Sequence, residues 1–323
     1  MTFIASVIAK EGVAIIADSL VTTSIPSLDF QTFQEYLTKA SKESGKEIVI
    51  NTKEIAKLFK VKPSHTKDYE EKLYKYDKYT AITTAGSASI NNKRIKKLIG
   101  EAIRTLKPNG RNNAKEIIAK IDSLKEFIVK EVKKFLEKNS RISETIFLVT
   151  FYSPTPNKTT VYKLTVNKAT NDSLKDESFE YVSILQQPDQ FKVICDGQNR
   201  LAERLLFGDL NGLFEIIPRI IGKVAKDFSL PAEKVGEEYW MEVIQDKSII
   251  DDKMMQDMKI YRLTELSLQQ AVDLATLLMR IEIDIQKYTE NIPTVGGVIK
   301  LAVIDNDGFR FISGNEIVKH EVF

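Results

Sequence analysis

The stretch TFIASVIAKEGVAIIADS, residues 2–19, contains two short apolar runs separated by Lys10-Glu11-Gly12. A glycine in this place can supply the unusual backbone angle of a tight turn between two strands. The second run, residues 13–17, does not alternate with polar residues, which is typical of a strand covered on both faces. The sequence therefore predicts a β-hairpin whose second strand is buried.

Beyond this hairpin, the apolar pattern predicts strands, two helices, further strands, helices and closing strands. Strands are expected at residues 54–61, 79–85, 142–152, 159–166, 179–185, 191–195, 297–304 and 309–313. Helices are expected at residues 95–106, 117–136, 199–207, 213–228 and 267–285, the last opened by a capping box of Ser267 and Gln270. This order fits an α+β fold in which two sheets pack face to face between layers of helices.

The composition is that of a soluble globular protein, with 43% hydrophobic and 28% charged residues among 323. The 47 basic and 45 acidic residues nearly cancel and are interspersed. A nucleic-acid partner is therefore not expected, since the phosphate backbone requires a concentrated basic surface. There is no signal-peptide pattern and no run of about 20 apolar residues that could span a bilayer. We expect a cytoplasmic protein without membrane contact.

Thiol and imidazole side chains are few. Cys195 is the single cysteine and lies in an apolar run, so we expect a small core residue in a reducing compartment rather than a nucleophile. His65 and His320 are the two histidines, and their separation does not favour a zinc site. Nothing around either histidine suggests a Ser-His-Asp triad. No metal or organic cofactor is expected.

Thr2 is the residue that suggests chemistry. Removal of Met1, which generally proceeds when the next side chain is small, would leave Thr2 with a free α-amine. Its hydroxyl can then attack a carbonyl, and its own amine, with a pKa of about 7.7–8.0, can accept the proton. The alternative is that Thr2 merely starts a strand, and taken alone that reading is the stronger one. Whether Thr2 is a nucleophile therefore depends on the residues around it.

The segments TFIASV (residues 2–7) and GVAIIADS (residues 12–19) resemble the opening of proteasome β subunits and of the bacterial HslV and Anbu proteins, which are N-terminal-nucleophile (Ntn) hydrolases. That family starts with threonine and has an aspartate sixteen residues later, the separation of Thr2 and Asp18. The resemblance implies that Asp18 orients a lysine that lowers the pKa of the threonine site. It implies that the backbone of Thr22 pairs with the substrate, and that the fold is a four-layer αββα sandwich of two antiparallel sheets.

The family's lysine opens the next strand, followed at once by an aliphatic residue and by another three residues later. Lys57 fits this pattern best, and Lys53 less well because an acidic residue follows it. The other reading of Lys57 is a lysine on an exposed strand edge. Residues 84–89, TAGSAS, are similar to the family's Ala-Gly-Thr/Ser-Ala-Ala-Asp, so Gly86 is the implied backbone donor to the oxyanion. A glycine that allows close packing would give the same pattern.

The C-terminal part also resembles the family, with a helix at 268–285 followed by TVGGVIKLAVIDNDG at 294–308. Two supporting motifs are altered. The family's Asp-x-x-Ser before the Gly-Gly pair is replaced by Ile292 and Val295. The serine of the family's Gly-Ser-Gly is missing around Gly197, although Asp196 offers a carboxylate there. The chain is longer than HslV, and within one domain of residues 1–323 we expect insertions near 25–50, 62–78 and 208–262.

The resemblance leads to a prediction of function. The chain is expected to be a threonine peptidase or amidohydrolase that cleaves peptide bonds through an acyl-enzyme, with Thr2, Asp18, Lys57 and Gly86 as catalytic residues and Thr22 as a substrate-binding residue. Two alternatives stay open: a catalytically silent scaffold subunit, favoured by the missing Asp and Ser, and a hydrolase of small-molecule amides. The family further implies polypeptide substrates, homo-oligomeric rings or spirals, and an ATPase unfoldase as a partner.

Overall fold

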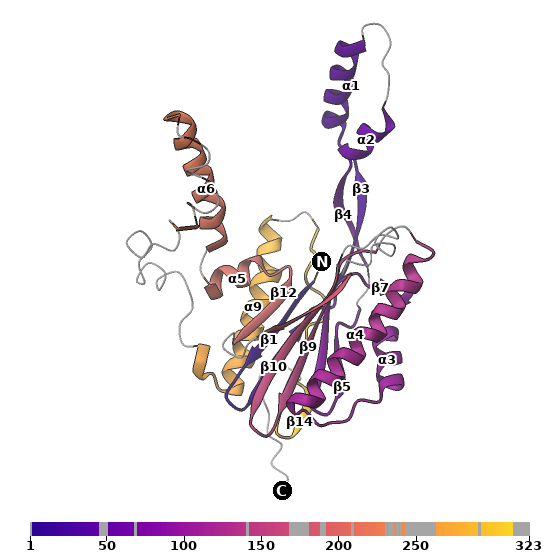
Figure 1. Cartoon of the computed structure of the whole chain (residues 1–323), viewed down its shortest axis with the longest axis vertical. Coiled ribbons are helices and arrows are strands. Elements are labelled where there is room, and N and C mark those ends of the chain that lie inside the picture. Colours follow the sequence, from indigo (N-terminus) through magenta and orange to yellow (C-terminus); the bar gives the residue numbers. More distant parts are fainter. Residues whose placement is uncertain are drawn as a thin grey trace.

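Two antiparallel sheets form the body of the molecule in the computed structural model (Figure 1). The structure describes residues 2–44, 51–67, 70–139, 142–167, 181–187, 192–207, 210–229, 263–289 and 292–312, with single positions between 231 and 242. The predicted α+β class is confirmed.

The N-terminal sheet is built around the predicted hairpin. Its strands, in spatial order, are β12 (Val193–Gly197), β1 (Phe3–Ile8), β2 (Gly12–Ala17), β13 (Lys300–Asp305) and β14 (Gly308–Ile312). β1 and β2 pair antiparallel and both are buried along their whole length, as the unbroken apolar run of β2 predicts. A Cβ at Gly12 would lie 2.4 Å from the carbonyl oxygen of Ile304. Gly12 is not among the glycines with positive φ, so the turn does not require it; glycine is required here because it allows β13 to lie against β2.

The second sheet consists, in spatial order, of β11 (Val182–Gln187), β10 (Lys158–Val166), β9 (Thr145–Ser153), β6 (Thr80–Gly86) and β5 (Leu73–Asp77). It packs face to face on the N-terminal sheet. Side chains such as Ile15 and Ala302 from one sheet and Ala81 and Leu148 from the other form a single buried cluster. This cluster is the central core of the protein.

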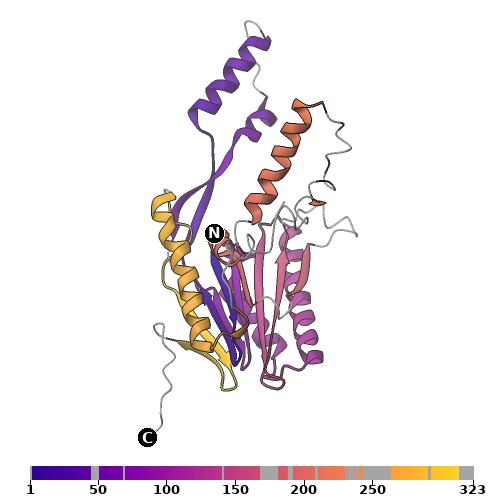
Figure 2. The same cartoon turned by 90° about the vertical axis from the view of Figure 1, so that its left-hand side faces the viewer.

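Helices cover the outer face of each sheet (Figure 2). α9 (Leu268–Thr289) and α5 (Arg200–Phe207) pack on the N-terminal sheet, and α3 (Ile95–Leu106) and α4 (Ala114–Leu136) pack on the second sheet. The apolar positions recur at helical spacing and are the positions that are buried. The predicted capping box is confirmed, because Ser267 and Gln270 exchange side-chain to backbone hydrogen bonds.

An arm rises from one end of the body in both views (Figures 1 and 2). It consists of β3 (Val21–Ser27), α1 (Phe30–Ser44), α2 (Thr52–Leu58) and β4 (Lys60–Lys67), with β3 and β4 paired antiparallel. The described part of the expected insertion near 25–50, residues 25–44, lies in this arm. The strand predicted at 54–61 is wrong, since its first part is α2. Asn51 accepts hydrogen bonds from the N–H groups of Glu54 and Ile55, which starts a helix there.

The expectation for residues 62–78 also differs from the structure. Residues 73–77 of this range form β5, which pairs with β6 in the second sheet. Tyr74 and Tyr76 pack into the core beneath α3 and α4, and the exposed Lys75 lies between them. The aromatic side chains therefore belong to a strand that is buried at all positions but Lys75.

The third expected insertion, near 208–262, includes α6 (Leu210–Asp227), which rises from the same end of the body as the arm (Figures 1 and 2). Most of the remainder, with Trp240, lies outside the described residues. Within the part of the chain that is described, no helix combines the length and apolar character needed to cross a membrane.

Candidate functional site

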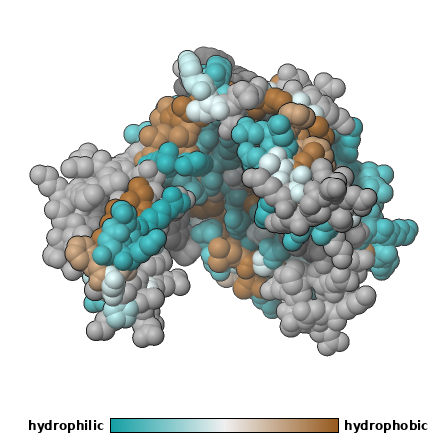
Figure 3. Space-filling model, turned by 90° about the horizontal axis from the view of Figure 1, so that it is seen from above, coloured by the Kyte–Doolittle hydropathy of each residue, from teal (hydrophilic) through white to brown (hydrophobic). Residues whose placement is uncertain are grey.

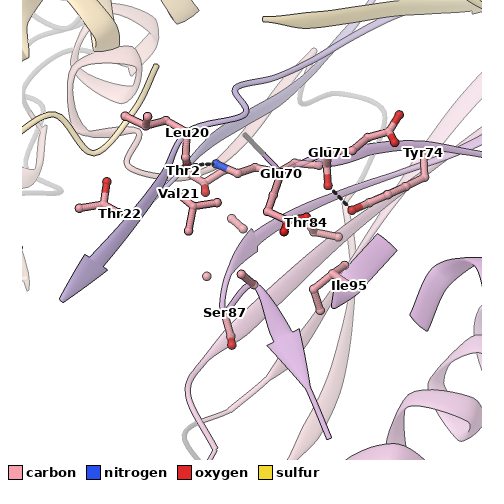
Figure 4. A pocket seen from close by; sticks show the side chains of 14 residues that line it. Thr2, Leu20, Val21, Thr22, Glu70, Glu71, Tyr74, Thr84, Ser87 and Ile95 are labelled. Carbon is pink, nitrogen blue, oxygen red and sulfur yellow. Dashed lines mark hydrogen bonds between the residues drawn. The ribbon is translucent and has the colours of Figure 1, made fainter. Parts of the chain in front are cut away.

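Thr2 lies directly before β1 and lines a pocket of about 170 Å³ (Figure 4). Thr22 of β3, Lys72 directly before β5, and Gly86 at the end of β6 line the same pocket. Thr2 is 3% exposed. The fold therefore brings Thr2, Thr22 and Gly86, all predicted from the sequence as site residues, to the walls of one cavity.

Asp18 is the buried centre of the site. It lies directly after β2 and is 0% exposed. Its carboxylate accepts hydrogen bonds from the backbone N–H groups of Phe3 (3.2 Å), Leu20 (3.2 Å) and Gly296 (3.1 Å) and from Nζ of Lys72 (2.9 Å). A buried carboxylate requires such compensation. Because Phe3 directly follows Thr2, Asp18 also fixes the chain beside Thr2.

The lysine beside Asp18 is Lys72 and not Lys57. Nζ of Lys72 donates to Oδ1 of Asp18 at 2.9 Å and to the carbonyl oxygen of Leu20 at 2.6 Å. Lys57 lies in the last turn of α2 in the arm and is exposed. The sequence-based choice of Lys57 is corrected on this point, because the arm places it outside the pocket.

A sequence signal for Lys72 was present but incomplete. Lys72 directly precedes the strand that starts at Leu73, as the family pattern requires. The residue three positions after Leu73 is Tyr76, where the pattern expects an aliphatic side chain. Lys57, with Leu58 and Val61, matched the pattern better by coincidence.

Burial acts on both members of the Asp18–Lys72 pair. Loss of hydration raises the pKa of the Asp18 carboxyl and lowers the pKa of the Lys72 ammonium, while their mutual attraction and hydrogen bonds oppose both shifts. A protonated Asp18 would lose one of its four hydrogen bonds. We therefore treat the pair as ionised at neutral pH, with Lys72 as a positive charge next to the pocket.

Gly86 occupies a position that tolerates no other residue. Its φ is +97°, and a Cβ there would lie 2.3 Å from the carbonyl oxygen of Glu144. The reading of Gly86 as a close-packing glycine therefore holds. Its role as an oxyanion donor stays a prediction.

Thr22 is held at the base of the arm. Its hydroxyl donates to the carbonyl oxygen of Pro293 at 2.9 Å, and its backbone pairs in register with Thr66 of β4. This links the pocket wall to the segment that precedes β13. Substrate pairing by Thr22 stays a prediction.

The presence of glycine rather than serine at position 197 has a steric explanation. Gly197 has a φ of +86°, and a Cβ there would lie 1.9 Å from the carbonyl oxygen of Thr2. The next residue, Gln198, donates its N–H to that same oxygen at 2.6 Å. β12 therefore approaches Thr2 too closely for any side chain at position 197.

The neighbouring Asp196 is engaged elsewhere, and Cys195, as expected from the sequence, is not arranged as a nucleophile. Asp196 forms an ion pair with Lys163 and accepts the N–H of Gly197 at 2.7 Å. Burial raises the pKa of the Cys195 thiol to about 12, so this group is protonated at neutral pH. Among the described residues, no group of three or more His, Cys, Asp or Glu is placed to hold a metal ion.

Models of known protein families and curated proteins give no match to this chain. The site consists of a buried Asp–Lys pair, a threonine at the first described position, and a glycine-bordered pocket.

Proposed function

We propose that the protein is an Ntn hydrolase in which Thr2 cleaves peptide bonds through an acyl-enzyme. The proposal depends above all on the position of Thr2 at the wall of the pocket. Lys72, which forms a buried ion pair with Asp18, lines the same pocket. The sixteen-residue separation of Thr2 and Asp18 supports it. Helices outside two facing sheets fit the four-layer αββα sandwich of these enzymes.

The reaction follows from the chemistry of an N-terminal threonine. Once Met1 is removed, the α-amine of Thr2 accepts the hydroxyl proton while the hydroxyl oxygen attacks the substrate carbonyl carbon. The N–H of Gly86 stabilises the negative oxygen of the intermediate. The α-ammonium then gives its proton to the leaving amine, and water hydrolyses the resulting ester. The positive charge of Lys72, in place of the expected Lys57, lowers the pKa of the α-amine, which keeps the amine unprotonated at neutral pH and able to accept the hydroxyl proton.

The size of the pocket bears on the substrate. Its volume of about 170 Å³ is below the roughly 300–1,000 Å³ typical of sites that enclose small molecules. One side chain of a longer peptide is therefore the better-matched occupant than an enclosed small-molecule amide. We infer a polypeptide substrate.

The test combines intact mass with a variant. Wild-type protein is expected to have the mass of a chain starting at Thr2 and to hydrolyse casein or a fluorogenic peptide. Thr2→Ala should lose at least about a thousandfold in rate, because it removes the nucleophile, and should keep its circular dichroism spectrum. Full activity in Thr2→Ala would disprove the mechanism. Faster hydrolysis of short acyl-amides than of peptides would instead support a small-molecule amidohydrolase.

A catalytically silent scaffold is the second candidate. It is favoured by Val295, which is 1% exposed and packs in the apolar core where the resembling family has a serine. A wild-type mass that retains Met1, together with absence of hydrolysis, would support this candidate.

We further propose that the protein is cytoplasmic and self-assembles into a ring or spiral, with an ATPase unfoldase as a partner. These properties rest on the resemblance. Light scattering coupled to size-exclusion chromatography tests the assembly, and a monomer at micromolar concentration would contradict it.

A further inference from the structure

A short turn, residues 293–296, connects helix α9 with the buried Asp18. On the helix side, Oε1 of Gln286 accepts the N–H groups of Thr294 at 2.6 Å and Val295 at 3.1 Å. On the other side, Gly296 donates its N–H to Oδ2 of Asp18 at 3.1 Å. Gln286 is 2% exposed, so its hydrogen bonds to the turn do not compete with bulk water. The position of Asp18 is thus coupled to a side chain of α9.

A second connection runs from the same turn to Thr2. The hydroxyl of Thr294, a residue that is 0% exposed, contacts the side-chain amides of both Gln198 and Gln286. The backbone N–H of Gln198 donates to the carbonyl oxygen of Thr2 at 2.6 Å. Thr294 therefore lies between the residue that holds Thr2 and the residue that holds the turn at Asp18.

The number of protons available determines which group donates and which accepts in the hydrogen bonds among Gln198, Thr294 and Gln286. A hydroxyl has one proton, so Thr294 cannot donate to the amide oxygens of both Gln198 and Gln286. The oxygen and nitrogen of an amide exchange places when the group turns over. With the amide of Gln198 turned, its Nε2 donates to the Thr294 hydroxyl, which in turn donates to Oε1 of Gln286. Every member then has a partner, which a buried polar network requires.

We propose that Gln198, Thr294 and Gln286 form a positioning network for the proposed reaction. The network holds Thr2 through its carbonyl oxygen and Asp18 through Gly296, and so fixes the distance between the nucleophile and the Asp18–Lys72 pair. It acts at the place where the side chains of Ile292 and Val295 can form no hydrogen bond. This inference rests on the proposed function, and its residues position Thr2 without touching substrate.

The test removes one polar group of the network at a time. Thr294→Val keeps the shape of the side chain and is expected to lower kcat about tenfold to a hundredfold with KM within about twofold, because small displacements of a nucleophile affect the chemical step most. Thr294→Ser restores the hydroxyl and should recover most of kcat. Gln198→Leu, at a half-buried position that should tolerate the change, is expected to lower kcat in the same way.

The matched control is Thr276→Val. Thr276 is a buried threonine of α9 that is 6% exposed, and its hydroxyl donates to the carbonyl oxygen of Val272 at 2.9 Å. Both Thr276→Val and Thr294→Val remove a buried hydroxyl and should lower the thermal stability. Thr276→Val, however, should retain the kcat of wild type. Equal kcat in Thr294→Val and wild type, or an equal loss in Thr276→Val, would overturn the positioning role while leaving the proposed function intact.

Labelling with a peptidyl epoxyketone separates the two proposals. Wild-type protein that takes the probe at Thr2, with slower labelling of Thr294→Val, supports the network. Wild-type protein that neither hydrolyses peptides nor takes the probe overturns the proposed function, and the positioning role with it.

Discussion

At the scale of single residues, the site depends on a buried ion pair that two distant segments bring together. Asp18 and Lys72 are 54 residues apart, and their side chains are 0% and 8% exposed. Taking two charges out of water is unfavourable, and only close pairing with further hydrogen bonds offsets it. The four donors around Asp18 meet this condition, so the pair is both a structural element and a source of local charge.

Replacing Lys72 by Met tests this pair. Asp18 would be left as an unpaired buried carboxylate, so we expect a loss of about 3–5 kcal/mol in the free energy of unfolding and of about a hundredfold or more in hydrolysis. Urea unfolding and peptide hydrolysis measure the two effects. Lys57→Met is the control and should match wild type in both.

A double variant separates charge from function. Asp18→Asn combined with Lys72→Met removes both charges and should be more stable than Lys72→Met alone, without recovering hydrolysis. It should stay below wild type in stability, because Nδ2 of the asparagine cannot accept the backbone N–H groups that both oxygens of Asp18 accept. Wild-type activity in Lys72→Met together with loss of activity in Lys57→Met would restore the original sequence-based assignment.

At the scale of elements, a small hairpin between β6 and α3 is held to helix α4 by charge. Glu131 of α4 accepts hydrogen bonds from Asn91 (2.9 Å) in the turn between β7 (Ser89–Ile90) and β8 (Lys93–Arg94), and it pairs with Lys93 (3.0 Å) and Lys134 (3.2 Å). Burial alone would raise the pKa of Glu131, but these partners outweigh it and lower the pKa from 4.5 to about 2. The hairpin directly follows Ala88 of the pocket wall.

This pKa predicts a pH dependence of stability. Because the folded-state pKa lies below the ordinary value, the contribution of Glu131 is present above about pH 4.5 and is lost as the pH falls toward about 2. Glu131→Gln should be less stable than wild type at pH 6 and should lose less stability between pH 4.5 and 2. Urea unfolding across this pH range measures the free energy of unfolding of each variant. Glu126→Gln, at an exposed position of the same helix, is the control. Identical pH profiles of Glu131→Gln and wild type would contradict the prediction.

At the scale of the whole molecule, the arm and α6 leave the body at one end, beside the start of β1 (Figures 1 and 2). Seen from above, apolar patches interrupt the polar surface of this end (Figure 3). On α6, Ile216, Ile220 and Val224 are 52%, 56% and 44% exposed and are spaced four residues apart. An apolar stripe of this kind marks an interaction surface more often than a solvent-facing one. It supports the proposal of self-assembly.

Ile220→Asp tests the contribution of α6. A charge in an apolar interface weakens association, so we expect a shift toward smaller species in size-exclusion chromatography with light scattering. Ile118→Asp on α4 is the matched control, because Ile118 is 52% exposed on a different face, and it should leave the oligomer unchanged. An oligomer of the same size in Ile220→Asp would show that α6 is not part of the interface.

The sequence by itself determined the local elements. The β1–β2 hairpin, α3, α4 and α9 were predictable because unbroken apolar runs on either side of a turn, and apolar positions at a period of 3.6, are properties of neighbouring residues. Thr2, Asp18 and Gly86 were chosen from the resemblance to proteasome-like proteins, which rests on short motifs within or next to such elements.

Only the tertiary structure decided which side chains meet. It placed Lys72 instead of Lys57 at Asp18, turned the predicted strand at 54–61 into a helix of the arm, and explained the glycine at position 197 by its approach to Thr2. It also brought Gln198, Gln286 and Thr294 together from three separate segments. The physical reason is the same in each case. Contacts between distant segments depend on how sheets and helices pack, and a local apolar pattern contains no information on which polar groups that packing joins.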